Sequence, residues 1–272
     1  MPDIAAKDVM ALRQRTGLSM MECKKALVET GGDADAAEEF LRKKLKGKMD
    51  TRTDRVAGEG RIAIAVDGNN AAIIELAAET DFTAKNENFA NVAQEIATMA
   101  LSADAGPVAA TDEMTKVLDE LRISTGENIS ITRLDKRSGD NAHFGTYVHH
   151  DGKTGVLLHA DASIAEDVAK DVCMHITAAM PRPQGVTRDD VPAEMIEKER
   201  KLAMEMAIEG GKNEEIAAKM VEGKVNKLYS DLALIEQPFV KDDSKKIKDI
   251  VGGEDKIHAF RRWQVGETAS AE

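Results

Sequence analysis

The strongest pattern along the chain is an apolar run followed by a helical repeat of apolar positions. Residues 71–78 are almost continuously apolar, which predicts a buried strand. From residue 89 onward, apolar side chains recur at the i, i+3, i+4, i+7 spacing of an amphipathic helix. These side chains are Phe89, Val92, Ala93, Ile96, Ala97 and Ala100.

Phe82 lies in the connection between this strand and this helix. An aromatic side chain at such a place either closes the core from below or projects outward as an anchor for a binding partner. Buried phenylalanine is the commoner case, so the residue type by itself favours the core. The pattern alone leaves both alternatives open.

Three short helices are expected at the start of the chain, in residues 1–50. Thr16-Gly17 ends the first helix, because glycine accepts the positive φ of a helix C-terminus. Ser19 is suited to cap the second helix and Asp33 the third. Three helices of this length bury little apolar surface, which is typical of docking modules.

The charged, apolar-poor stretch from Gly47 to Gly60 is expected to be a linker, and the interdomain linker proper is assigned to residues 51–60. Its end, Gly58-Glu59-Gly60-Arg61-Ile62-Ala63, matches a G-x-G-x-x-A dinucleotide fingerprint in letters only. That fingerprint follows a strand and opens a helix, whereas here a β-branched strand pattern comes next. With no G-x-x-x-x-G-K-[ST] loop either, the chain has no evident nucleotide site of its own.

The rest of the chain is expected to form a core of two similar α+β subdomains with antiparallel sheets. The first, residues 61–124, holds a strand hairpin, the helix described above and a second helix capped by Thr111. The second, residues 125–272, is expected to repeat this architecture, with a two-residue turn at Asp151-Gly152. Its strands are expected at residues 128–134, 143–149 and 154–160.

An antiparallel helical hairpin is expected to protrude from the second subdomain at about residues 192–230. Gly210-Gly211-Lys212 would form its turn, and the seam is too short for a long dimeric coiled coil. The predicted seam consists of Met195, Ile196, Leu202, Ala203 and Met206, facing Ile216, Met220, Val221, Val225 and Leu228. A short helix at Ser244–Val251 and a strand at Ile257–Val265 are expected near the end of the chain.

Composition and charge exclude several classes of function. The net charge of −12 argues against non-specific nucleic-acid binding, which requires a basic surface. Cys23 and Cys173 lie too far apart in sequence for a metal or redox motif. No apolar run is long enough to span a bilayer, and no signal segment opens the chain. A cytoplasmic protein without a cofactor is therefore expected.

The histidines raise the alternative of an enzyme. His149, His150 and Asp151, together with His159 and Asp161, could supply imidazole and carboxylate ligands to zinc. Their spacing matches no standard ligand motif, so a polar hairpin edge is the favoured interpretation. No G-x-S-x-G elbow supports a serine hydrolase.

Several segments resemble the bacterial elongation factor Ts family, whose members exchange guanine nucleotides on elongation factor Tu. The most recognisable is Thr80-Asp81-Phe82-Thr83-Ala84-Lys85-Asn86, with a further phenylalanine at position 89. Leu12-Arg13, Thr16-Gly17, Met20-Met21 and Cys23-Lys24-Lys25-Ala26-Leu27 are similar to the family's UBA-like (ubiquitin-associated-type) N-terminal domain. Further similar segments are Thr125-Gly126-Glu127-Asn128, Tyr147-Val148-His149, His175-Ile176-Thr177-Ala178-Ala179 and Phe260-Arg261-Arg262-Trp263-Gln264-Val265-Gly266-Glu267.

The resemblance implies a partner and the residues that contact it. The partner would be elongation factor Tu in its GDP-bound and nucleotide-free states. The chain itself would form a homodimer or a 2:2 complex with Tu, and no direct nucleic-acid or membrane contact is expected. The surface facing the Tu G domain would be formed by Thr80, Asp81, Phe82, Thr83, Gly126 and His149. The N-terminal domain would dock through Arg13, Thr16, Gly17, Met20, Met21 and Lys24.

The implied mechanism involves no covalent chemistry, so the chain is expected not to be an enzyme. Asp81 and Phe82 would enter the G domain and displace elements near the Mg²⁺ that bridges the nucleotide phosphates. A factor that prefers the nucleotide-free state must weaken nucleotide binding by the same factor. The other alternative is a UBA-like adaptor whose first helices bind a different partner, the rest being scaffold.

Overall fold

The computed structural model describes residues 4–50 and 55–267. The chain divides into two compact units that alternate along the sequence. The first unit holds the residues up to Ala63, Ile74–Asp135 and the residues from Val265 on, and the second holds Ile64–Ile73 and Lys136–Gln264. Helices and antiparallel sheet are both present, which confirms the predicted α+β class.

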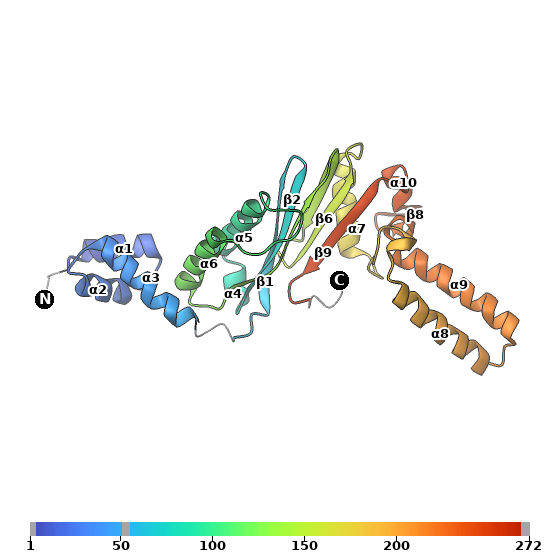
Figure 1. Ribbon diagram of the computed structural model, residues 1–272, viewed down its shortest axis with the longest axis horizontal. Helices are drawn as coiled ribbons and strands as arrows, with labels where there is room; N and C mark the ends of the chain where they lie inside the picture. The colour runs from blue at the N-terminus through green and yellow to red at the C-terminus, as the bar shows by residue number, and fades with distance from the viewer. Residues whose placement is uncertain (1–3, 51–54, 268–272) are drawn as a thin grey trace. The chain divides into compact units, whose positions relative to one another are not determined.

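The three N-terminal helices are α1 (Ala6–Thr16), α2 (Met20–Glu29) and α3 (Ala34–Asp50), as Figure 1 shows. Gly17 ends α1 with a φ of 69°. Ser19 caps α2 in a capping box with Glu22, and the Asp33 carboxylate accepts from the first free N–H groups of α3. Their buried side chains form one small core, consisting of Val9, Leu12, Leu18, Cys23, Ala26, Leu27, Ala37, Leu41 and Leu45.

The linker begins later than the charged stretch suggested. α3 continues through Gly47 to Asp50, because one glycine costs a helix only about 1 kcal/mol and the neighbouring lysines and leucine favour the helix. Residues 51–54 lie outside the described residues, and Glu59 already belongs to the first strand.

Four strands form the first sheet, in the order β1-β2-β4-β3. They are β1 (Glu59–Asp67), β2 (Asn70–Ala78), β3 (Gly106–Pro107) and β4 (Ser130–Ser138). Every residue of β2 after Asn70 is buried, as its apolar run predicts. Gly60 admits close approach of β1 and β2, since a Cβ there would lie 2.3 Å from the Leu76 carbonyl oxygen.

The two longer helices after β2 in the first unit are α5 (Glu87–Ala100) and α6 (Asp112–Thr125), and they lie side by side in Figure 1. All six positions of the predicted α5 repeat are buried. Thr111 caps α6 by accepting from the Met114 N–H. The hydrophobic pattern thus predicts both helices correctly.

β4 corrects the predicted division of the core. Residues 128–134 were expected to open the second subdomain, but β4 is the neighbour of β2 in the first sheet. Arg133 on β4 forms an ion pair with the buried Glu75 of β2, at 2.5 Å between Nη2 and Oε2. The division into compact units falls after Asp135, instead of between residues 124 and 125.

The second sheet is antiparallel, in the order β5-β6-β9. Its strands are β5 (Ala142–Val148), β6 (Thr154–Asp161) and β9 (Ile257–Gln264), and α7 (Glu166–Ala178) packs against β5 and β6. The turn at Asp151-Gly152 is wider than the predicted two residues. Residues 149–153 connect the strands, closed by a bond from the His149 N–H to the Thr154 carbonyl oxygen at 2.8 Å.

The helical hairpin consists of α8 (Ala193–Glu209) and α9 (Glu214–Leu232), antiparallel to each other (Figure 1). Its buried seam is formed by Ile196, Ala203, Ala207, Ala217, Val221, Val225 and Leu232. Half of the predicted seam is instead exposed, namely Met195, Leu202, Met206, Ile216 and Met220. Each of these residues directly precedes a buried seam residue and therefore lies about 100° away from it around the helix. A pair of helices buries only one narrow stripe on each helix.

Short elements connect these parts of the second unit: η1 (Arg188–Asp190), η2 (Leu234–Glu236), β7 (Pro238–Phe239), β8 (Asp242–Lys246) and α10 (Ile247–Val251). The helix predicted from Ser244 therefore begins only at Ile247, because β7 pairs with β8. None of the described helices is long and apolar enough to cross a membrane.

Candidate functional site

The end of β2 leads into a short helix that carries Phe82. α4 (Asp81–Ala84) has only four residues, and Thr80 caps it by accepting from the Thr83 N–H at 3.3 Å. Phe82 is 83% exposed, whereas Phe89, seven residues later, is fully buried. Ala84 is the buried residue of α4 and faces the core. Of the two alternatives for Phe82, the structure supports the outward one.

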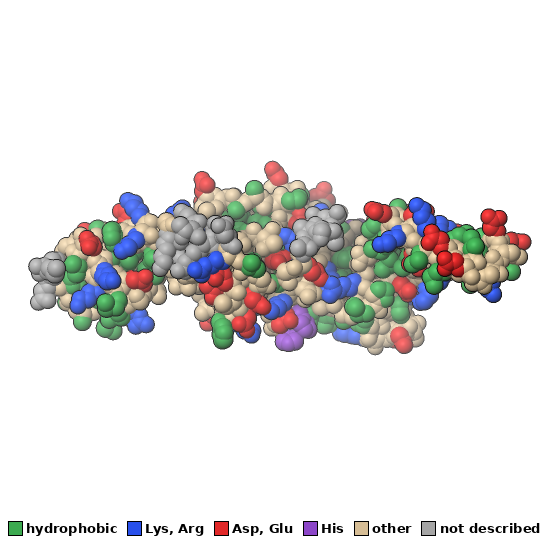
Figure 2. All heavy atoms as spheres, turned by 90° about the horizontal axis from the view of Figure 1, so that it is seen from below, with side chains coloured by type: hydrophobic (Ala, Val, Ile, Leu, Met, Phe, Trp, Pro, Cys, Tyr) green, Lys and Arg blue, Asp and Glu red, His purple; other side chains and the backbone are tan. Residues whose placement is uncertain are grey.

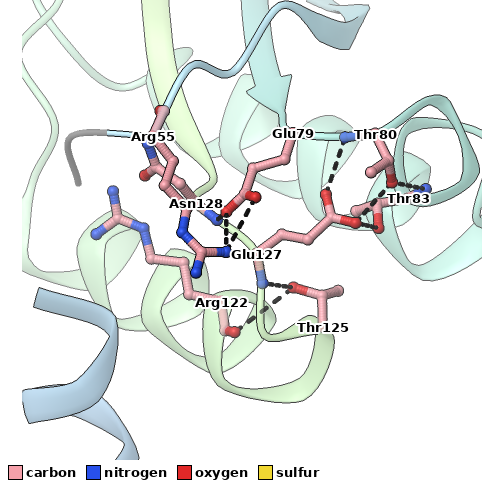
Figure 3. A network of polar contacts seen from close by, with 8 residues as sticks. All are labelled: Arg55, Glu79, Thr80, Thr83, Arg122, Thr125, Glu127 and Asn128. Carbon is pink, nitrogen blue, oxygen red and sulfur yellow. Dashed lines mark hydrogen bonds and ion pairs between the residues drawn. The ribbon is translucent and has the colours of Figure 1, made fainter. Parts of the chain in front are cut away.

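Glu127, from the loop after α6, is hydrogen-bonded to both Thr80 and Thr83 of this turn (Figure 3). Its Oε2 accepts from the Thr80 N–H at 3.1 Å. Its Oε1 accepts from two hydroxyl groups, that of Thr80 at 2.6 Å and that of Thr83 at 2.7 Å. One carboxylate therefore receives three hydrogen bonds from both ends of the turn that carries Phe82.

A second carboxylate makes the reciprocal contact. Glu79 Oε1 accepts from the Asn128 N–H at 2.7 Å, and Glu79 also pairs with Arg55 at 3.2 Å. The Asn128 side chain donates to the Arg55 carbonyl oxygen at 2.8 Å. Each glutamate thus accepts a hydrogen bond from the backbone N–H of the residue that follows the other glutamate: Glu79 from Asn128, and Glu127 from Thr80. We call Glu79, Thr80, Thr83, Glu127 and Asn128 the carboxylate clasp.

Asp81 lies at the start of α4, beside Phe82 and outside the clasp contacts just described. Its carboxylate is bonded to Lys85 Nζ at 2.7 Å, an i,i+4 pair with both side chains largely accessible to solvent. Such pairs contribute about 0.3–0.5 kcal/mol. The turn therefore carries a carboxylate and an exposed aromatic ring at adjacent positions.

Gly126 shapes the loop from which Glu127 reaches the turn. It ends α6 in the left-handed region with a φ of 73°, and its N–H donates to the Arg122 carbonyl oxygen. The Arg122 guanidinium in turn donates to the Ile129 carbonyl oxygen at 2.5 Å. Among the residues predicted for the partner surface, Thr80, Asp81, Phe82, Thr83 and Gly126 are thus brought together in the first unit.

His149 belongs to the second unit, in the loop between β5 and β6. The Tyr147 hydroxyl lies 3.1 Å from its Nδ1, and its ring lies 4.3 Å from that of His150. Figure 2 shows histidine side chains gathered at one place on the molecular surface. Within the described residues, no group of three or more His, Cys, Asp or Glu side chains is arranged to hold a metal ion.

His159 lies among rings and not among carboxylates. It stacks on Phe144 and meets the edge of His258, with ring centroids 5.0 and 5.1 Å apart. Burial, followed by the charges of His258 and Arg137, lowers the pKa of His159.

Burial raises the pKa of the Cys173 thiol to about 12, which makes this cysteine a poor nucleophile.

The residues predicted for N-terminal docking fall into two groups. Arg13, Met20, Met21 and Lys24 are exposed on α1 and α2. Thr16 and Gly17 shape the turn between these helices, because the Thr16 hydroxyl donates to the Leu12 carbonyl oxygen at 2.8 Å and Gly17 supplies the positive φ.

Neither Glu79 nor Glu127 was predicted as a site residue, although Glu127 lies inside the motif Thr125-Gly126-Glu127-Asn128 and Glu79 directly precedes Thr80. Each segment does carry a usable signal. Its glutamate comes directly after a buried strand or a helix C-cap, where backbone N–H groups of the following residues need acceptors. What the sequence does not contain is that these two segments, 47 residues apart, face each other.

The fold and the site define an α+β protein that presents an exposed aromatic side chain on a short turn. A sequence model of the family described as elongation factor TS matches residues 79–267, more than half of the chain, and includes the whole clasp. The chain belongs to the elongation factor Ts family. That family comprises nucleotide exchange factors and not catalysts of covalent chemistry, and membership implies a role and a partner in translation elongation.

Proposed function

We propose that this chain binds elongation factor Tu in its GDP-bound and nucleotide-free states and promotes release of GDP, so that GTP can bind. The observation that carries the proposal is the 83% exposure of Phe82 on a clasped turn inside the region that matches the family. Aromatic side chains are enriched among the residues that anchor protein interfaces, and a turn that is already fixed avoids the entropy of ordering it during binding.

In this mechanism Phe82 enters the G domain of Tu as a wedge, and Asp81 fixes its direction of entry. The wedge displaces elements near the Mg²⁺ that neutralises the nucleotide phosphates. Since binding is reciprocal, tighter binding to nucleotide-free Tu means weaker binding of GDP in the complex. Gly126 supports this surface through the clasp, and His149 contributes a contact from the second unit.

The direct test is release of a fluorescent GDP analogue from Tu, with and without the full chain. We expect release to accelerate with wild-type protein and to slow with Phe82→Ala. Val56→Ala is a matched control, because Val56 is 85% exposed in the same unit and lies outside the clasp. Release at the unassisted rate with wild-type protein would refute the proposed function.

The N-terminal helices act as a docking handle in the same proposal. Met20 and Met21 are exposed together at the start of α2, and flexible thioethers adapt to a partner surface. The double variant Met20→Ala/Met21→Ala is expected to weaken binding to Tu while leaving the maximal release rate unchanged. An unchanged affinity would remove this handle from the proposal.

A further inference from the structure

The exposed turn cannot hold its own shape. α4 has four residues, and a helix this short does not repay the entropy of fixing its first turn. Its one inward residue, Ala84, buries little surface. Phe82 contributes nothing to holding the turn, since most of its surface faces solvent. The fixed direction of Phe82 must therefore come from contacts outside the helix.

The capping bond of α4 depends on Glu127. The Thr83 N–H donates to the Thr80 hydroxyl oxygen, which leaves the hydroxyl proton available for a second hydrogen bond. Glu127 Oε1 accepts this second bond, at 2.6 Å. The same oxygen accepts from the Thr83 hydroxyl, so Glu127 fixes Thr80 and Thr83, the first and last residues of the segment 80–83, on either side of Phe82.

We infer that Glu127 is the positioning residue of the exchange site: it orients Phe82 through Thr80 and Thr83. This inference rests on the proposed function. Glu79, the other carboxylate of the clasp, bonds to Asn128 and Arg55, whereas Glu127 accepts all three bonds that Thr80 and Thr83 donate to it. The two glutamates stabilise the same clasp, but the direction of Phe82 is assigned to Glu127.

A positioning role predicts a particular kinetic signature. Without Glu127 the turn samples several conformations, and only the fraction with Phe82 correctly directed can bind. The apparent affinity falls by that fraction, whereas the bound complex still contains the wedge. Glu127→Ala is therefore expected to raise the concentration for half-maximal GDP release about tenfold, the scale of one to two lost hydrogen bonds, with little change in the maximal rate.

The experiment compares Glu127→Ala, Glu127→Gln and the matched control Glu79→Ala in the full chain. Glutamine keeps one acceptor oxygen, and the threonine hydroxyls can rotate to accept from its NH₂ group, so the half-maximal concentration should stay within about threefold of wild type. Glu79→Ala should lower the melting temperature at least as much as Glu127→Ala, but raise the half-maximal concentration less.

Amide hydrogen exchange of the free protein provides a readout that does not involve Tu. The Thr80 and Thr83 amides should exchange faster in Glu127→Ala, while the Asn128 amide should respond mainly to Glu79→Ala. Unchanged protection of Thr80 and Thr83 in Glu127→Ala overturns the inference, as does an equal kinetic effect of Glu79→Ala. If wild-type protein fails to accelerate GDP release, the proposed function fails, and the hydrogen-exchange comparison still decides whether Glu127 holds the turn.

Discussion

Phe82 and Phe89 are the same residue type seven positions apart, yet one is 83% exposed and the other is fully buried. Phe89 opens a 14-residue helix in which apolar residues follow at helical spacing, so its neighbours complete an apolar face. Phe82 lies in a four-residue helix between a charged and a hydroxylated residue. The difference teaches that burial follows from the partners at i+3 and i+4, not from the side chain alone.

The largest effect is expected for the buried member of the pair. Phe89→Ala removes a fully buried ring from the apolar face of α5, which should lower the free energy of unfolding by about 3–5 kcal/mol. The measurement is denaturant unfolding, with GDP release normalised to the folded fraction. A loss of stability well below this range would show that burial of Phe89 does not stabilise the fold as the comparison requires.

The exposed member should respond in the opposite way. Phe82→Ala is expected to change the free energy of unfolding by less than about 0.5 kcal/mol, as surface substitutions do. Burial of a phenylalanine at an interface contributes roughly 1.5–3 kcal/mol, so GDP release should slow by about one to two orders of magnitude. Melting temperature and release rate are measured on one preparation. A strongly lowered melting temperature with normal release would contradict the wedge.

A smaller effect on stability is expected from a buried histidine, His175, and this effect depends on pH. His175 accepts from the Val240 N–H through Nδ1 and contacts Gln237 through Nε2, so its buried ring is neutral. Burial lowers its pKa below the ordinary value of 6.5, partly offset by the Gln237 bond. The unfolded chain takes up this proton first, so His175 contributes stability above about pH 6.5 that is lost as the pH falls.

Melting temperatures of wild type and His175→Gln at about pH 7.5 and pH 5.5 test this dependence. Acidification should lower the melting temperature of wild type more than that of the variant, because only wild type loses the contribution of a neutral buried imidazole. Equal shifts in the two proteins would assign the acid sensitivity to other groups.

The smallest effect is expected for Asp81→Ala, which sharpens the comparison within the exposed turn. The Asp81–Lys85 pair contributes about 0.3–0.5 kcal/mol, so stability should hardly change. Release of GDP should slow several-fold, less than for Phe82→Ala. The double variant should lose less than the sum of the two, because both side chains enter the partner together. Strict additivity in this cycle would separate their roles.

Local pattern carried much of the fold. The six buried positions of α5, the caps formed by Ser19, Asp33 and Thr111, and the glycine end of α1 all follow from interactions within a few residues. Two of the predictions that were wrong concern features that depend on contacts between elements distant in sequence. β4 pairs with β2 in the first sheet and does not open the second subdomain. The hairpin buries Ala203 and Ala207 at its seam, whereas Leu202 and Met206 are exposed.

The candidate site shows the same limit. The exposure of Phe82 was expected from the family resemblance, whereas the residue type alone favoured the core. The carboxylate clasp could not be foreseen, because it consists of contacts between segments that no periodicity relates. Glu79 precedes one motif and Glu127 lies inside another, but nothing in the sequence indicates that each accepts from the backbone N–H of the residue following the other.

The clasp also sets an order of events while the protein is being made. Its two halves are 47 and 49 residues apart in the chain, so the ribosome adds Phe82 well before Glu127 and Asn128. Until the later segment has emerged, the turn at Phe82 lacks its anchor, and a four-residue helix does not persist alone. An unfinished chain therefore carries the aromatic residue without its fixed direction, and we expect it to become competent to engage a partner only after Asn128 has left the exit tunnel.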